Sequence, residues 1–216
     1  MPKTSKLNLE AMEEQCMRLI EESGARLEMK TTGVHYRLSS GCHSEIFFNM
    51  ARVFERYSVR NYLAQFFLRK IKNGGIDPRS IDVLIGPATG ALPLLYTLQN
   101  FPDFEHTRVM YAERDREGKF MLGKGFEIRD NEQIFILDDV GTTFKSLRAV
   151  QKIVESSNGC LRGVGVLIDR SPNEKRDEHI TAGACSFAYI CGIRVPEVYI
   201  EKNCPHCKEG IPVVKV

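Results

Sequence analysis

Gln133–Ser146 reads QIFILDDVGTTFKS: an apolar run, two adjacent acids, and then a short loop rich in small and hydroxyl-bearing residues. The apolar run is typical of a strand that is covered on both faces of a sheet. A helix is predicted from about Lys145 to Ser157, because apolar residues then repeat at helical spacing and Asn158-Gly159 follows. A strand that leads through a loop into a helix indicates the βαβ units of a parallel sheet.

Similar apolar runs recur elsewhere in the chain, at 81–87 (IDVLIGP), 107–113 (TRVMYAE), 162–169 (RGVGVLID) and 186–191 (SFAYIC). The segments after 81–87 and 133–139 read as helices. This alternation predicts an α/β fold with a central, mostly parallel five-stranded sheet flanked by helices. In such sheets the ligand sites lie at the carboxyl ends of the strands.

The first 52 residues have a different pattern. An amphipathic helix is predicted after an N-cap at Asn8, and the short alternating pieces of 27–49 indicate a hairpin or a small antiparallel lobe. A second helix is predicted at about 53–72. We therefore expect an N-terminal helix and hood lobe (1–52), an α/β core (53–192) and a C-terminal tail that packs on the hood (193–216).

Composition excludes several classes of function. The 216 residues include 30 basic and 28 acidic ones, so the net charge of +2 gives no global field for a nucleic acid or a membrane surface. No apolar run approaches bilayer length, and the first residues lack the apolar core of a signal peptide. The seven cysteines are odd in number and scattered, which favours reduced thiols. We expect a cytoplasmic protein.

The twin acids and the loop after them indicate a specific ligand chemistry. The loop Val140–Phe144 feeds a helix N-terminus, where backbone N–H groups and the hydroxyls of Thr142, Thr143 and Ser146 can bind a phosphate. The carboxylates of Asp138 and Asp139 require hydrogen-bond donors or a cation instead. A sugar phosphate satisfies both halves. Two alternatives are acids that are merely solvated or capping, and a metal-binding acid pair.

Five segments, in order along the chain, resemble a known family. ILDDVGTTFKS resembles the phosphoribosyl-pyrophosphate motif of type I phosphoribosyltransferases, and the whole chain resembles the orotate phosphoribosyltransferase group within them. The other segments are the amino-terminal substrate segment YRLSSGCHSEIFFN (36–49), the pyrophosphate loop IGPATGALPL (85–94), the mobile catalytic loop AERDREGKFMLGKGF (112–126) and the base-anchoring strand VLIDRS (166–171). CPHCKEGIPVVK (204–215) resembles the tail of one subgroup.

The resemblance implies an activity. Ribose 5-phosphate would pass from phosphoribosyl pyrophosphate to orotate, with Mg²⁺, to give orotidine 5′-phosphate and pyrophosphate in pyrimidine biosynthesis. This glycosyltransferase would act as a homodimer, with the mobile loop of one subunit reaching the site of its neighbour. Because charge develops on both the sugar and the leaving group, catalysis would depend on positioning and electrostatic stabilisation without a protein nucleophile.

The resemblance also implies residue roles. Asp138 and Asp139 would hold the ribose hydroxyls, directly or through magnesium. Arg114 and Lys119 would act in the mobile loop. The substrate-binding residues would be Ala88, Thr89, Gly90, Arg116, Val140, Gly141, Thr142, Thr143, Phe144, Lys145, Ser146, Arg170, Phe47 and Phe48.

Each of these assignments has a plainer alternative. PATG can be an ordinary strand-to-helix turn, and the charge run around Arg116 can be a solvated hairpin tip. Arg170 is expected to grip the carboxylate of orotate through two parallel bonds, but it can also be a surface ion pair. Phe47 and Phe48 can be core residues.

The sequence departs from the family at three positions. Phe144 stands where many members have glycine, so we expect an altered loop or a narrower phosphate pocket. The loop ERDREGKF has one lysine and no histidine, and Ser39 replaces a frequent lysine. A regulator that binds phosphoribosyl pyrophosphate with little catalysis, or an enzyme for another base, is therefore an alternative. Arg170 distinguishes an enzyme for orotate from an enzyme for another base, because a base without a carboxylate gives the guanidinium no partner.

The tail motif Cys204-Pro-His-Cys207 is interpreted first as structural. Two cysteines supply half of a zinc site, so His206 or Cys191 would have to converge with them to bind a metal. His43 is interpreted as a hydrogen-bonded residue of the lobe rather than a catalyst.

Overall fold

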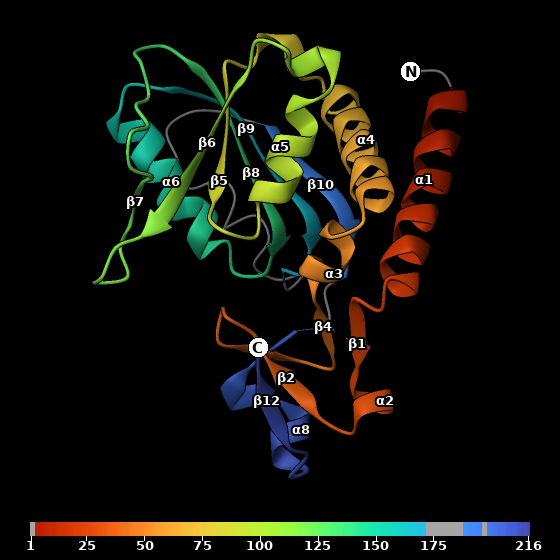
Figure 1. Ribbon diagram of the computed structural model, residues 1–216. Helices are drawn as coiled ribbons and strands as arrows, with labels where there is room; N and C mark the ends of the chain where they lie inside the picture. The colour runs from red at the N-terminus through yellow and green to blue at the C-terminus, as the bar shows by residue number, and fades with distance from the viewer. Residues whose placement is uncertain (1–2, 172–187, 196–197) are drawn as a thin grey trace.

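The computed structural model describes residues 3–171, 188–195 and 198–216 (Figure 1). Among them a large α/β body carries a smaller β-rich hood, drawn in Figure 1 above and below respectively. No helix in these ranges combines the length and the apolar character that a membrane span needs.

The body is built on a sheet in which six described strands follow the order β10-β9-β8-β5-β6-β7. The bounds are β5 Val83–Pro87, β6 Arg108–Arg114, β7 Phe120–Leu122, β8 Gln133–Gly141, β9 Cys160–Asp169 and β10 Ala188–Arg194. Five of these strands are parallel, which confirms the predicted sheet, while β7 adds an antiparallel edge that was not predicted. Ser186 and Phe187 of the predicted strand 186–191 lie outside the described residues.

Helices cover both faces of this sheet. They are α1 Lys3–Glu22, α3 Met50–Phe54, α4 Tyr57–Asn73, α5 Leu92–Gln99 and α6 Lys145–Ser156, with short 3-10 turns at Pro78–Ser80 and Pro102–Phe104. Two predicted boundaries were wrong. The first helix begins before Asn8, at Lys3, and the helix predicted at 53–72 is two helices, α3 and α4.

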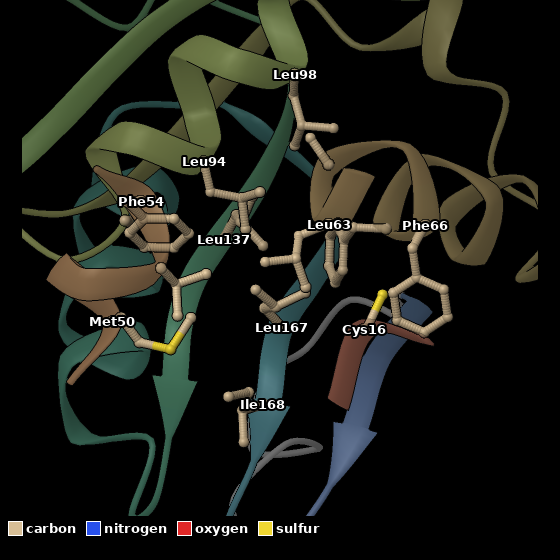
Figure 2. Packing of buried hydrophobic residues seen from close by; sticks show 14 of the residues in the cluster. Cys16, Met50, Phe54, Leu63, Phe66, Leu94, Leu98, Leu137, Leu167 and Ile168 are labelled. Carbon is tan, nitrogen blue, oxygen red and sulfur yellow. The ribbon is translucent and has the colours of Figure 1, made fainter. Parts of the chain in front are cut away.

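Side chains alternate between the two faces of each strand, as the pleat requires. On one face Leu137 and Leu167 pack beneath Leu63 of α4 and Leu94 of α5, and Cys16 of α1 lies against α4 (Figure 2). On the other face Ile134, Ile136 and Val166 pack against α6 through Leu147 and Val150. The central strands are covered on both sides, which explains their continuous apolar runs.

The hood combines segments from both ends of the chain. Its described elements are β1 Arg26–Glu28, α2 Met29–Thr32, β2 His35–Arg37, β3 Cys42–Ser44, β4 Ile46–Phe48, β11 Tyr199–Ile200, a 3-10 turn at Glu201–Asn203, α8 Pro205–Lys208 and β12 Val213–Lys215. β1 pairs with β4, and the hairpin β2–β3 is flanked by the tail strands in the order β11-β3-β2-β12. The described hood is thus an antiparallel hairpin extended by the C-terminal segment. The division of the chain at residues 52 and 192 stays a prediction.

Candidate active site

Asp138 and Asp139 lie near the carboxyl end of β8, at the edge of the sheet that faces the hood. The strand continues to Gly141, two residues beyond its predicted end, because Val140 and Gly141 still pair with Ile168 and Asp169 of β9. Both acids are half-buried and line one pocket. Both side chains therefore face this pocket.

Backbone donors orient the two carboxylates. The Asp139 N–H donates to Asp138 Oδ1 at 2.9 Å, and the Val140 N–H donates to Asp139 Oδ1 at 2.8 Å. Loss of water and the negative charge of Asp139 raise the pKa of Asp138 well above its usual range. Loss of water also raises the pKa of Asp139. A ligand that brings hydrogen-bond donors or positive charge relieves both effects, so the site is complementary to a diol or a cation.

The loop after β8 leads into the N-terminus of α6, as predicted. The first N–H groups of a helix have no partner within it, and together with the helix dipole they favour an anion. Val140, Gly141, Thr142, Thr143, Lys145 and Ser146 line a pocket of about 160 Å³ at this helix end. The loop therefore has the composition and the position of a phosphate-binding site.

Phe144 is accommodated by a left-handed backbone with φ of 54°. Its ring turns into the core, where it lies against Gly141 and Val166, and only 4% of the residue is exposed. A Cβ atom on Gly141 would lie 2.5 Å from the Phe144 ring, so the glycine makes room for the phenylalanine. The residue still borders the pocket, but its ring packs in the core beneath the loop.

The turn between β5 and α5 brings Ala88 and Gly90 beside the twin acids. A Cβ atom on Gly90 would lie 2.8 Å from Asp139 Oδ1, so only glycine permits this approach of backbone and carboxylate. Ala88 and Gly90 line the same pocket as the acids, whereas Thr89 between them is exposed. The predicted pyrophosphate loop and the predicted diol-binding acids are therefore adjacent.

The pocket that contains both acids has a volume of about 410 Å³. Its floor is the end of the sheet, and its opposite wall comes from the hood through Phe47, Phe48 and Asn49. Phe48 is also part of the core, and Phe47 lies beside Tyr36 with ring centroids 5.8 Å apart. Phe47 and Phe48 therefore both pack against other side chains and line the pocket.

Arg170 is 1% exposed, and the structure places it in this pocket at the end of β9. Its Nη1 donates to the Ile46 carbonyl at 2.8 Å and its Nη2 donates to Ser44 Oγ at 2.5 Å. The guanidinium also lies 5.4 Å from the centre of the Phe48 ring. The hood therefore holds this cation in a fixed orientation at the pocket wall.

The predicted mobile loop is a β-hairpin of β6 and β7. Arg114 lines both pockets, while its Nη1 donates to the Gly118 carbonyl at 2.8 Å and its guanidinium lies 4.2 Å from the centre of the Phe120 ring. Arg116 and Lys119 are exposed at the tip of the hairpin and are not among the residues that line the two pockets.

Several residues that line the pockets were not among the predicted site residues, although Ser39 and Phe120 lie in segments that the resemblance had singled out. Ser39 and Ser40, on the turn between β2 and β3, face the phosphate loop across the smaller pocket, and Leu38, Met50, Phe120 and Val216 line the larger one. The paired hydroxyls beside Gly41 were a usable signal for Ser39 and Ser40. The apolar residues gave none, because they become pocket residues only when hood and core meet.

The arrangement combines an anion site at a helix N-terminus, two acids suited to a diol, and a buried cation at the far wall. Such a pocket can hold a sugar phosphate and a carboxylate-bearing partner next to each other.

Comparison with known proteins identifies what the chain is similar to. The chain is 34% identical to an orotate phosphoribosyltransferase of Thermoanaerobacter sp. (strain X514) over 84% of this chain and 87% of the relative. It is 32% identical to that of Pelotomaculum thermopropionicum, with 94% and 95% covered. No protein-family model matches.

Solved structures share the fold. Orotate phosphoribosyltransferase from Aeropyrum pernix aligns with a TM-score of 0.63 and 21% identity, over 82% of this chain and 92% of that one. An adenine phosphoribosyltransferase from Thermoanaerobacter pseudethanolicus aligns with a TM-score of 0.56 and 14% identity, over 69% and 88%. Because enzymes for different bases share the architecture, the fold alone does not select the base.

Proposed function

Because the chain belongs to the orotate phosphoribosyltransferase family, we propose that it transfers ribose 5-phosphate from phosphoribosyl pyrophosphate to orotate. The products are orotidine 5′-phosphate and pyrophosphate. The bond from the anomeric carbon to pyrophosphate breaks and the leaving group takes its electron pair. A ring nitrogen of orotate forms the new bond with its own electron pair and loses its proton to solvent. The observation that carries this proposal is that the twin acids, the phosphate loop and Arg170 line adjoining pockets.

Each part of the pocket has a role in this reaction. The loop Val140–Ser146 binds the 5′-phosphate, and Asp138 and Asp139 accept from the ribose hydroxyls. Arg170 pairs with the carboxylate of orotate, and Phe47 and Phe48 border the base. Fixed groups of this kind accelerate the reaction by holding the reactants in line and by matching the charge of the transition state.

Magnesium fits the same site. The raised pKa values of Asp138 and Asp139 indicate carboxylates that gain from nearby positive charge, and oxygen ligands are those that Mg²⁺ prefers. Asp138 and Asp139 would hold the ion through substrate or water, and the ion would supply positive charge against the leaving pyrophosphate.

The test is an assay with phosphoribosyl pyrophosphate, Mg²⁺ and orotate, followed by the absorbance of the pyrimidine. We expect turnover with orotate and none with uracil, adenine or hypoxanthine. Arg170→Lys keeps the charge but loses the planar fork, so it should raise KM for orotate more than KM for phosphoribosyl pyrophosphate. Arg18→Lys, on the exposed side of α1, is the matched control. Turnover of a base that has no carboxylate contradicts the proposal.

One observation favours a second candidate, a regulator that binds phosphoribosyl pyrophosphate without turning it over. Arg116 and Lys119 stand at an exposed hairpin tip, away from the residues that line the pockets. Calorimetry with phosphoribosyl pyrophosphate and Mg²⁺ in parallel with the assay separates the two. Binding without turnover of any base supports the regulator.

A further inference from the structure

The hood contains four metal-ligating side chains that the proposed reaction does not use. They are His35 on β2, His43 on β3, Cys204 just before α8 and Cys207 within it. Their ligand atoms all lie within 4.8 Å of one another. We refer to these four residues as the Cys2His2 cluster. It joins two segments that are far apart in the sequence.

The spacing of the ligand atoms is that of a metal site. His35 Nε2 lies 3.2 Å from His43 Nδ1, and Cys207 Sγ lies 3.4 Å and 3.3 Å from these two atoms. A tetrahedral zinc ion with bonds of about 2.05 Å to nitrogen and about 2.3 Å to sulfur separates two nitrogens by about 3.3 Å and nitrogen from sulfur by about 3.5 Å. The three distances in the structure are therefore close to the edges of such a tetrahedron.

Most of the cluster is shielded from water. His35, His43 and Cys204 are buried, and only Cys207 is exposed. Buried ligands of this kind are typical of a structural metal site rather than of a catalytic site that is open to substrate.

Residues around the cluster hold its members in place. The His35 N–H donates to the Pro212 carbonyl at 3.0 Å, and the Ile211 N–H donates to the His206 carbonyl at 2.9 Å. His206 itself pairs with Glu45 through its Nε2 at 2.9 Å. His206 is therefore not among the four clustered side chains, and the side chain of Cys191 lies outside the described residues.

We propose that the Cys2His2 cluster binds one Zn²⁺ ion as a structural site that fastens the C-terminal tail to the hood. Two thiolates and two imidazoles in tetrahedral array are the ligand set of structural zinc, and four protein ligands leave no position for a substrate. The site is separate from the magnesium chemistry at the twin acids, and metal binding does not depend on the proposed function.

The last strand of the tail buries little of its side chains. The strand β12 is exposed along its length, with Val213 and Val214 47% and 42% exposed, so it buries little apolar surface against β2. Short strands without a buried face are marginal in water. A metal bond between α8 and the β2–β3 hairpin supplies the missing stabilisation, because zinc binding energy becomes folding energy.

The position of the site links it to the pocket. The turn that follows β2 carries Leu38, Ser39 and Ser40 to the pocket walls, and Val216, whose N–H donates to the Arg37 carbonyl at 3.1 Å, lines the larger pocket. Zinc that fixes the hairpin and the tail therefore also fixes one wall of the substrate site.

The primary experiment measures metal in the full-length protein, purified under reducing conditions without an added histidine tag. We expect one zinc per chain by mass spectrometry of the metal content. After the protein is stripped with a chelator, cobalt(II) should give the absorption bands of a tetrahedral thiolate site, and the addition of zinc should remove them. If the reduced protein takes up no zinc or cobalt, or if it holds iron or copper instead, the zinc site is overturned.

Matched variants locate the site. Cys207→Ser removes the exposed ligand with little risk to folding, and we expect it to weaken zinc retention in a chelator competition at least tenfold. Cys160→Ser, in β9, and His106→Ala, on the surface, change the same residue types outside the cluster and should retain one zinc. Equal retention in Cys207→Ser and Cys160→Ser would contradict the assignment.

A third measurement tests the structural role. Removal of zinc should speed tryptic cleavage after Lys208 and lower the unfolding temperature, and zinc should reverse both changes. A zinc-loaded protein whose tail is cleaved as fast as that of the stripped protein would overturn the fastening role. If orotate turnover is absent but zinc is bound, the proposed reaction fails and the metal site stands.

Discussion

Asp138 and Asp139 are placed where ionisation is disfavoured until a ligand arrives. Their neighbours are each other, a few backbone N–H groups and the close backbone of Gly90. Functional sites commonly keep groups in such an environment, because the energy released on binding then depends on the ligand. Phe144, three residues beyond the end of β8 at Gly141, is a second costly residue, since its left-handed backbone is disfavoured for any side chain.

We predict that Asp138→Asn abolishes turnover and makes the ligand-free protein more stable at pH 7. The pKa of Asp138 is raised in the folded state, so its contribution to stability is present below the unfolded value of about 3.8 and is lost as the pH rises through the folded value. The asparagine variant has no carboxyl group to ionise at this position, so it does not lose this stability as the pH rises. Thermal unfolding between acidic and neutral pH should show the two proteins diverging as the pH rises. The surface variant Glu105→Gln should follow the wild type at every pH.

Phe144→Gly relieves the left-handed backbone but removes a buried ring. The relief is about 1–2 kcal/mol and the lost packing about 3–5 kcal/mol, so we expect a net destabilisation of about 1–4 kcal/mol. Asn131→Gly, at another left-handed but exposed residue, should change stability by less than about 0.5 kcal/mol. Urea denaturation measures both. A Phe144→Gly protein as stable as the wild type would show that the ring contributes little to the core.

At the scale of single elements, the β6–β7 hairpin shows how local hydrogen bonds convert a predicted loop into strands. The Asp115 carboxylate accepts from the N–H groups of Glu117 and Lys119, both at 2.9 Å, and Gly118 adopts a φ of 81°. These contacts close a tight turn, so the flanking residues pair. β7 is thereby added to the central sheet as its antiparallel edge strand. Periodicity gave no signal, because β7 is only three residues long.

The turn between β5 and α5 supports another prediction. Gly90→Ala would place a methyl group 2.8 Å from the Asp139 carboxylate, so the carboxylate or the turn must shift from its present position. We expect kcat/KM to fall at least about tenfold, since a displacement of this kind costs 1.4 kcal/mol or more in the transition state. Circular dichroism should show an unchanged fold.

Gly75→Ala provides the control for this change. Gly75 has a φ of 82° and open space around it, so the alanine strains the backbone far from the pocket. It should lower the unfolding temperature and leave kcat/KM unchanged. Equal activity of Gly90→Ala and wild type would show that Asp139 has room to adapt.

At the scale of the whole molecule, the pocket lies where hood and core meet. The core supplies the acids, the phosphate loop and the cation of Arg170, and the hood supplies Ser44 and the Ile46 carbonyl that orient this cation. The charged hairpin tip extends beyond the residues that line the pocket in a single chain. If the hairpin tip of a second copy of the chain lay at this pocket, its Arg116 and Lys119 would supply positive charge next to the pyrophosphate.

The homodimer that the family resemblance implies, with the hairpin of one subunit at the site of the other, predicts complementation between two inactive variants. Lys119→Ala lacks the hairpin cation and Asp138→Asn lacks the diol acceptor, so each alone should be nearly inactive. When they are mixed and allowed to exchange subunits, hybrid dimers contain one intact site, and the mixture should recover about a quarter of wild-type turnover. Size-exclusion chromatography with light scattering gives the oligomeric state. A mixture that stays inactive although subunits exchange would show that each site uses its own hairpin.

The sequence by itself determined the parallel sheet and the placement of acids and hydroxyls at its edge. Buried strands require apolar runs, and the acids and hydroxyls of 138–146 are adjacent in the chain, so their juxtaposition needs no knowledge of the fold. Tertiary structure decided the contacts between distant segments: Gly90 against Asp139, Ser44 and Ile46 on Arg170, and His35 and His43 beside Cys204 and Cys207. The periodicity of a segment predicts its own secondary structure but not which distant segments it will contact. Those contacts form only when the hood, the tail and the core pack together.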